Sequence, residues 1–270
     1  MPDTDLRVSL VQGDTLWHAP DANRAMYRAQ ALPLKGLTDL VVLPETFTSG
    51  FSNEAIAEAE GMDGPTIPWM RALATELDAA VTGSVQINDR GRVYNRMLFV
   101  EPDGHLRHYD KRHLFRMARE HERYAPGRER ISFDYRGWRI CPLVCYDLRF
   151  PVFCRNRHGH DTPGGFDYDL LLFVANWPAP RRHAWRSLLV ARAIENLACV
   201  VGVNRVGTDG NEVPYAGDSM AIDHLGRTVL DLGERPLVAT ASFSGADLAA
   251  HRERFPAQLD ADRFELLPGD

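Results

Sequence analysis

The sequence is poor in cysteine and lacks the features of membrane, secreted and nucleic-acid-binding proteins. Only four of its 270 residues are cysteines and none forms a CxxC pair, so we expect free thiols rather than a disulfide scaffold. The net charge is −6 and no basic stripe occurs, which argues against nucleic acid as a partner. No apolar run approaches the roughly 20 residues of a membrane helix. The acidic first residues do not match a signal peptide, so we expect a cytoplasmic protein without membrane contact.

The ten histidines do not predict a metal site. They include His105 and His108, which lie in a polar, loop-like stretch without a thiolate or carboxylate at the tight spacing of structural zinc sites. We therefore expect surface histidines, no metal and no organic cofactor.

The order of the predicted elements indicates one α/β domain over residues 1–270. Two hairpin-like returns argue against a pure eightfold barrel, and the simplest arrangement is a sandwich of mixed sheets covered by helices. Residues 112–130 are polar and predict a loop. Helical spacing predicts helices at 21–32, 65–80, 182–196 and 246–255. Apolar or alternating runs predict strands at 6–12, 40–43, 80–87, 92–100, 105–111, 140–145, 169–178, 198–204, 219–223, 228–230 and 237–243.

Three predicted strands end next to a reactive side chain. The strand at 140–145 ends in Cys145, and Glu45 and Lys111 follow or end two others. A thiol needs a base or a nearby cation to act as a nucleophile, and these two residue types supply both. Taken singly, each residue also fits an ordinary role: a buried apolar cysteine and two solvated surface charges.

Three segments together resemble the signatures of the nitrilase superfamily of carbon–nitrogen hydrolases. They are residues 43–47 (LPETF), 109–115 (YDKRHLF) and 144–151 (VCYDLRFP), in that family's order. The resemblance extends to residues 176–178 (NWP), 192–196 (RAIEN), 204–207 (NRVG) and 215–219 (YAGDS), so it covers nearly the whole chain. Such an ordered match is far more specific than any one segment.

The resemblance implies a four-layer αββα sandwich of two mixed sheets that forms a homodimer. It also implies that Cys145 is the acylated nucleophile, that Glu45 is the general base and that Lys111 stabilises the oxyanion together with a backbone N–H near residue 146. Family members carry a second glutamate, which the spacing to residues 125–127 assigns to Glu120, with Glu122 as the competing choice.

Within the superfamily, the segments around Glu45, Phe115 and Cys145 look most like the omega-amidase branch. That branch hydrolyses the terminal amide of short α-keto dicarboxylic monoamides, such as α-ketoglutaramate and α-ketosuccinamate, to the acid and ammonia. A small anionic amide needs a cation or hydroxyls for its carboxylate. The predicted pocket residues are Tyr146, Arg149, Phe47, Phe115, Arg116 and Trp177.

Several alternatives stay open at this point. Arg149 can instead form a structural ion pair with Asp147 or a neighbouring carboxylate, since a buried arginine is usually paired. The enzyme can be an aliphatic amidase, a carbamoylase or a nitrilase, and a non-catalytic binding protein is a remote possibility. Redox sensing at Cys145 would require a resolving thiol, for which Cys141 and Cys154 are the candidates.

Overall fold

The computed structural model describes residue 2, residues 4–159 and residues 165–266. The α-helices are α1 Pro20–Ala31, α2 Thr66–Leu77, α3 Pro151–Cys154, α4 Arg182–Asn196 and α5 Gly245–Arg254. Short 3₁₀ helices are η1 Leu32–Leu34, η2 Ala55–Glu58, η3 Arg116–Ala118, η4 Glu120–Glu122, η5 Cys145–Arg149, η6 Ala179–Arg181 and η7 Ala257–Leu259. The strands are β1 Leu6–Gln12, β2 Leu40–Val42, β3 Ala80–Asp89, β4 Arg92–Val100, β5 Leu106–Asp110, β6 Phe133–Tyr135, β7 Trp138–Val144, β8 Leu170–Ala175, β9 Cys199–Asn204, β10 Val206–Thr208, β11 Pro214–Ala216, β12 Met220–Ile222, β13 Thr228–Asp231 and β14 Leu237–Phe243.

Two six-stranded mixed sheets form the centre of the molecule. Their strand orders are β14-β1-β2-β3-β4-β5 and β13-β12-β9-β8-β7-β6. In each sheet three neighbouring strands run parallel, β1–β2–β3 in the first and β7–β8–β9 in the second, and the outer strands are antiparallel. The parallel strands β7, β8 and β9 are apolar over most of their length because sheet and helix cover both of their faces.

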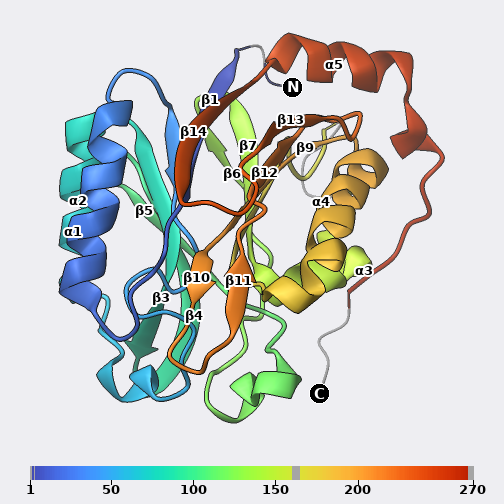
Figure 1. Ribbon diagram of the computed structural model, residues 1–270. Coiled ribbons are helices and arrows are strands. Elements are labelled where there is room, and N and C mark those ends of the chain that lie inside the picture. Colours follow the sequence, from blue (N-terminus) through green and yellow to red (C-terminus); the bar gives the residue numbers. More distant parts are fainter. Residues whose placement is uncertain (1, 3, 160–164, 267–270) are drawn as a thin grey trace.

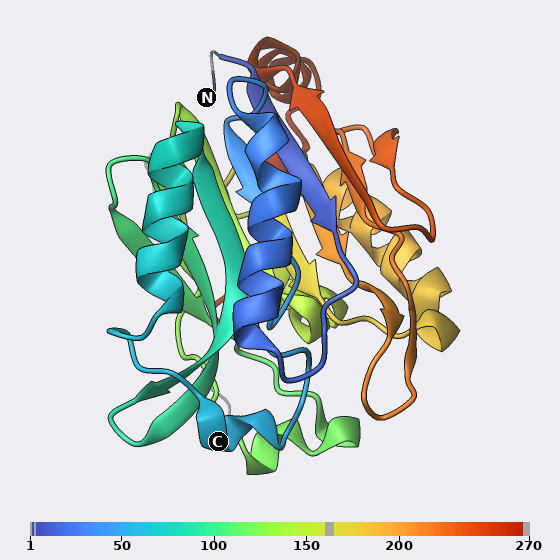
Figure 2. The same cartoon turned by 60° about the vertical axis from the view of Figure 1, so that its left-hand side comes forward.

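The two sheets pack face to face and helices cover their outer faces. Helices α1 and α2 lie side by side on the first sheet, and α4 lies on the second (Figures 1 and 2). Helix α2 buries one apolar stripe, from Ile67 through Met70, Leu73 and Ala74 to Leu77, which is the spacing of one face of a helix. One hydrophobic cluster spans both sheets and a second lies between the first sheet and its helices. The prediction of an αββα sandwich is confirmed.

The structure confirms the predicted strands and helices, apart from shifts at their ends, and adds several short elements. Strand β7 ends at Val144, so Cys145 does not end the strand as predicted but begins η5. Strands β6, β10 and β11 were not predicted because runs of three residues carry too little periodicity. The predicted loop 112–130 contains η3 and η4.

The predicted single domain covers residues 1–270, whose two ends lie outside the described residues, and it stays a prediction. Among the described helices, none combines the length and apolar content needed to cross a membrane.

Candidate active site

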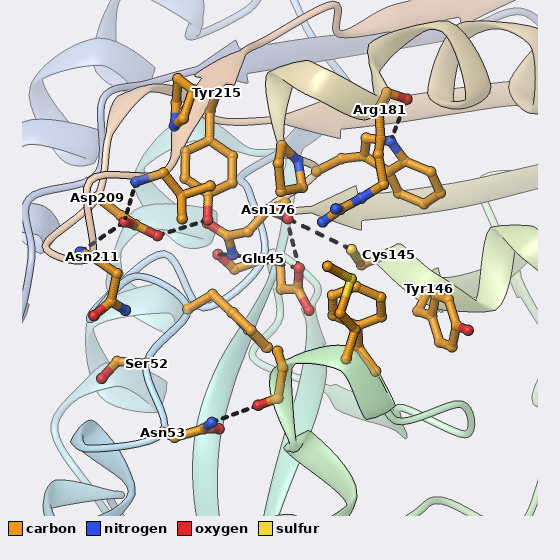
Figure 3. A pocket seen from close by; sticks show the side chains of 18 of the residues that line it. Glu45, Ser52, Asn53, Cys145, Tyr146, Asn176, Arg181, Asp209, Asn211 and Tyr215 are labelled. Carbon is orange, nitrogen blue, oxygen red and sulfur yellow. Dashed lines mark hydrogen bonds between the residues drawn. The ribbon is translucent and has the colours of Figure 1, made fainter.

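The carboxyl ends of the central parallel strands of both sheets meet at one cavity of about 610 Å³. Polar groups placed at such strand ends converge because parallel strands end at the same edge of a sheet. Figure 3 shows Glu45, Asn176 and Cys145 close together in this cavity. Its lining includes the predicted residues Glu45, Lys111, Phe115, Cys145, Tyr146, Arg149 and Trp177.

Glu45 is completely buried just beyond β2. The turn that carries it is held by the neighbouring strand β3, where the Ser84 hydroxyl accepts a hydrogen bond from the Thr46 N–H at 2.8 Å. Oε1 of Glu45 accepts hydrogen bonds from Asn95 Nδ2 at 2.8 Å and Lys111 Nζ at 3.0 Å, and Oε2 accepts one from the Asn176 N–H at 2.6 Å. These donors from both sheets satisfy the buried carboxyl oxygens of Glu45.

Lys111 follows β5 and its ammonium group is bound by two carboxylates. Nζ lies 3.0 Å from Glu45 Oε1 and 3.0 Å from each carboxylate oxygen of Glu120, and the side chain is 1% exposed. Burial alone would lower the pKa of Lys111, but the charges of Glu120 and Glu45 raise it well above its usual value. The lysine is therefore a permanent cation rather than a base. Gly127 closes the turn beside it, and a Cβ there would lie 2.0 Å from the Asp110 carbonyl oxygen.

The structure brings Glu120, not Glu122, to the site. Glu120 is buried at the start of η4 and accepts a further hydrogen bond from the Phe115 N–H at 2.6 Å. Burial raises the pKa of Glu120, Lys111 opposes this and Glu45 adds to it. Glu122 is exposed and pairs with Arg119.

Cys145 has a strained backbone and a thiol whose pKa is raised. Its φ of 46° lies in the left-handed region, which costs energy for a residue with a side chain. Sγ lies 3.9 Å from the Asn176 carbonyl oxygen. Burial, followed by the charge of Glu45, raises the pKa of the Cys145 thiol well above its usual value, although Lys111 works to lower it. A thiol whose pKa is raised in this way holds its proton more firmly than a free cysteine does.

Two of the predicted pocket residues lie outside the cavity lining. Phe47 is completely buried in the cluster between the first sheet and its helices, where its ring contacts Tyr27 and Trp69. The prediction of a pocket wall at Phe47 is therefore corrected: Thr46, with φ 41°, turns the chain so that the phenylalanine enters the core. Arg116 is exposed at the start of η3 and lies outside the cavity lining. The next residue, Met117, lines the cavity instead.

Arg149 lines the cavity, with its guanidinium 4.8 Å from the centre of the Trp177 ring. The alternative of an ion pair with Asp147 is wrong, because the Asp147 carboxylate is occupied by other donors. A second arginine, Arg181, also lines the cavity and lies 5.2 Å from the centre of the Phe115 ring (Figure 3). Within the described part of the chain, neither guanidinium is paired with a carboxylate.

Sequence reasoning did not identify several residues of the site. Asn95 and Asn176 hold Glu45, and the pair Tyr215–Asp209 forms the far wall, with the phenol donating to Asp209 at 2.8 Å. Asn176 carried a signal, since it follows a strongly apolar strand just as Cys145 does, and both Asn176 and Tyr215 lie in segments that resemble the family. Asn95 and Asp209 lie in ordinary polar patterns.

A comparison with known protein families decides the family. The carbon-nitrogen hydrolase family model matches residues 7–253. The chain belongs to the carbon-nitrogen hydrolase family. This confirms the predicted superfamily and the predicted class of hydrolase.

Individual carbon-nitrogen hydrolases are similar over most of the chain. The "Omega-amidase YafV" of Escherichia coli K12 is 47% identical over 264 residues, which are 97% of this chain and 98% of that protein. The "2-oxoglutaramate amidase" of Bacillus subtilis is 34% identical over 81% of this chain and 83% of its own length. The crystal structure of XC1258 from Xanthomonas campestris, described as a CN-hydrolase superfamily protein with an arsenic adduct in the active site, has a TM-score of 0.96 and 60% identity over 97% of this chain and 99% of its own. The predicted likeness to the omega-amidase branch is confirmed.

Proposed function

We propose that this protein is an omega-amidase that uses Cys145 as nucleophile, Glu45 as general base and Lys111 with Glu120 as the supporting ion pair. The observation that carries the proposal is the Cys145 thiol in the same cavity as a buried cluster of one cation, Lys111, and two carboxylates, Glu45 and Glu120. A carboxylate beside a protonated thiol fits a general base, and a fixed cation fits a developing oxyanion.

In the first half of the reaction, the thiol of Cys145 attacks the amide carbon of the substrate. The S–C bond forms while the thiol proton passes to Glu45, so no free thiolate has to exist beforehand. The oxyanion faces Lys111 Nζ and the N–H of Tyr146, which lies in the first turn of η5, where N–H groups have no partner within the helix. The intermediate expels ammonia, whose nitrogen takes the proton back from Glu45, and a thioester remains on Cys145.

In the second half of the reaction, Glu45 exchanges a proton with water instead of with the leaving ammonia. The carboxylate takes a proton from water as the oxygen attacks the thioester carbon. The S–C bond then breaks while Glu45 returns that proton to the sulfur, which gives the carboxylic acid, the neutral thiol and the free Glu45 carboxylate. Lys111 faces the second oxyanion as it faces the first. The ion pair with Glu120 keeps the lysine charged and fixed throughout, since a buried cation without a carboxylate would be unstable.

The substrate is a short amide with an anionic group at the far end from the scissile bond. Arg149 and Arg181, both without a carboxylate partner in the described residues, supply donors for that anion, and the rings of Trp177 and Phe115 beneath them form apolar walls. The names of the relatives in E. coli and B. subtilis agree with a monoamide of an α-keto dicarboxylic acid.

A substrate panel with ammonia detection tests the proposed function. We expect the highest kcat/KM for α-ketoglutaramate and α-ketosuccinamate, since both have a carboxylate for the two arginines and lack the α-ammonium group of glutamine, which the guanidinium groups would repel. Four compounds serve as comparisons: an uncharged aliphatic amide, an aliphatic nitrile, a carbamoyl amino acid and glutamine. A higher kcat/KM for the nitrile or for the carbamoyl compound would contradict the proposed omega-amidase activity. The protein would then be a nitrilase or a carbamoylase, which are the main alternatives within the family.

Replacing Arg149 by methionine is expected to raise KM for α-ketoglutaramate by about 10- to 100-fold, because a hydrogen bond to a charged group contributes about 1.5–3 kcal/mol. We expect a much smaller change in kcat, since the carboxylate lies away from the reacting carbon. Arg116→Met is the matched control, because this arginine is exposed outside the cavity lining. Equal KM values in the two variants would remove Arg149 from the binding site.

We also propose, from the family resemblance, that the protein acts as a homodimer in the cytoplasm.

A further inference from the structure

Asp147, two residues after Cys145, is a buried carboxylate that serves as the centre of a hydrogen-bond network. It is completely buried in η5. Oδ2 accepts hydrogen bonds from the Tyr109 phenol at 2.8 Å and from the Val144 N–H at 3.0 Å. Oδ1 accepts one from the His113 N–H at 3.0 Å and lies 2.7 Å from His113 Nδ1. Three separate segments, β5, the turn after Lys111 and the end of β7, therefore meet at one side chain.

Tyr109 connects this carboxylate to the chain on either side of Lys111. It is the penultimate residue of β5, and its phenol oxygen also accepts a hydrogen bond from the Arg112 N–H at 3.1 Å. Burial and the charge of Asp147 raise the pKa of Tyr109 well above its usual value, so the phenol remains a donor. The backbone that carries Lys111 is thus tied to the turn that carries Cys145.

Ring stacking extends the same connection to the cavity wall. The His113 ring stacks on Phe150 with centroids 3.7 Å apart, and Phe150 contacts Tyr146 edge to face at 5.1 Å. Tyr146 in turn contacts Phe115 at 5.0 Å, and both of these rings line the cavity. A shift of the Asp147 carboxylate would therefore move both the nucleophile turn and part of the substrate wall.

The turn at Cys145 needs such support because its backbone is strained. A residue with φ of 46° keeps that conformation only where its surroundings hold it. Val144 immediately precedes the cysteine, and its N–H donates a hydrogen bond to the Asp147 carboxylate. Asp147 itself follows Tyr146, whose N–H the proposed mechanism uses. The network thus acts on both sides of the strained residue.

We propose that Asp147, through Tyr109 and His113, is the positioning residue that holds the Cys145 thiol in register with Glu45 and Lys111. The role is geometric, and the Asp147 carboxylate takes no part in proton transfer. The inference rests on the proposed nucleophilic role of Cys145. Misplacing a reacting group by about 1 Å can lower a rate by about 100-fold, so loss of the network should act mainly on kcat.

Asp147→Asn is the most direct variant, since an amide cannot replace a carboxylate here. With its NH₂ group in the place of Oδ2 it would face the Val144 N–H, and in the place of Oδ1 it would face the His113 N–H. Either orientation leaves one backbone donor opposite another donor. We expect kcat to fall by about 100-fold with little change in KM.

Tyr109→Phe with Tyr135→Phe as its matched control decides the question even if Asp147→Asn fails to fold. Both phenols are buried and each bridges two partners; that of Tyr135 accepts from the Ala80 N–H at 3.0 Å and donates to the Asp39 carbonyl at 2.7 Å. Ala80 begins β3 and Asp39 precedes β2, so this second bridge lies at the opposite end of the strands from the cavity.

Three quantities are measured for both tyrosine variants: the melting temperature, kcat per active site titrated through Cys145, and the rate of Cys145 alkylation by iodoacetamide. We expect similar melting temperatures for the two. Only Tyr109→Phe should show a fall of about tenfold in kcat and a parallel change in alkylation rate, with KM nearly unchanged.

Equal kcat per titrated site in the two tyrosine variants would overturn the proposal, because Tyr109 would then contribute only to stability. That result differs from a failure of the proposed function itself. If Cys145→Ala retained activity, the nucleophile would be wrong, whatever the tyrosine variants show.

Discussion

Replacing Cys145 by alanine is expected to lower ammonia release from α-ketoglutaramate by about 10⁴-fold or more, as removal of a covalent nucleophile does in other hydrolases. The proposed reaction passes through a thioester, and no other side chain in the cavity lining carries a thiol. The fold should persist, because the cysteine is only partly buried and alanine removes only its sulfur, which lies 3.9 Å from the Asn176 carbonyl oxygen. Circular dichroism and the melting temperature check the fold, and a coupled ammonia assay checks the rate.

Cys199→Ala is the matched control for this experiment. Cys199 is a buried free thiol in β9 outside the cavity lining, so its loss leaves a small apolar gap and should leave kcat unchanged. Mass spectrometry after incubation with substrate should detect an acyl adduct on the wild-type chain and none on Cys145→Ala. Turnover by Cys145→Ala at the wild-type rate would contradict the proposed mechanism.

The redox-sensing alternative makes a different prediction for the same cysteines. Cys141 and Cys154 are buried, and burial raises the pKa of Cys141 to about 11 and that of Cys154 still further. Such thiols react slowly with an oxidised Cys145 because they are protonated. The structure therefore favours catalysis over a disulfide switch at Cys145.

Strand topology made the positions of the central residues predictable from the sequence, while their roles stay predictions from the family resemblance. Glu45, Cys145 and Asn176 follow strands that run parallel to their neighbours, and a buried apolar run that ends in a polar residue is visible in the sequence. The choice between Glu120 and Glu122 stayed open in the sequence, since no local pattern distinguishes them, and only the structure shows that Glu120 lies beside Lys111.

Side-chain direction beyond the strand ends was not predictable. Phe47 lies two residues past Glu45, so an extended chain would have placed both on one face, but the positive φ of Thr46 turns the ring into the core. Side-chain direction was equally unpredictable in η3, where Met117 and not the predicted Arg116 lines the cavity. Asn95, in the middle of β4, has no local signal, because its partner Glu45 lies 50 residues away in the sequence.

Replacing Lys111 by methionine is expected to abolish activity and to destabilise the fold. Methionine fills much of the space of the lysine chain but leaves Glu45 and Glu120 as buried carboxylates without a cation. Removing one partner of a buried ion pair typically costs about 3–5 kcal/mol of unfolding free energy. Urea denaturation at pH 7 measures this loss, and the ammonia assay measures activity.

The destabilisation of Lys111→Met should increase with pH. Burial and Glu45 already raise the pKa of Glu120, and removal of Lys111, which lowers it, raises it further. A carboxyl group with a raised pKa in the folded state binds more protons there than in the unfolded state. The stability of the variant therefore falls as the pH rises from the unfolded pKa of about 4.3 towards the folded one. Relative to wild type, we expect the smallest deficit at about pH 4 and a growing deficit as the pH rises to 7.

The double variant Lys111→Met/Glu120→Gln separates stability from chemistry. Removing the Glu120 charge together with the lysine leaves one buried carboxylate, Glu45, which keeps its hydrogen bonds from Asn95 and Asn176. We expect most of the lost unfolding free energy to return, while activity stays absent because no cation faces the oxyanion. A double variant that regained activity with stability would show that Lys111 serves only to hold the fold. One that stayed as unstable as Lys111→Met would mean that the charge of Glu120 is not the source of the destabilisation.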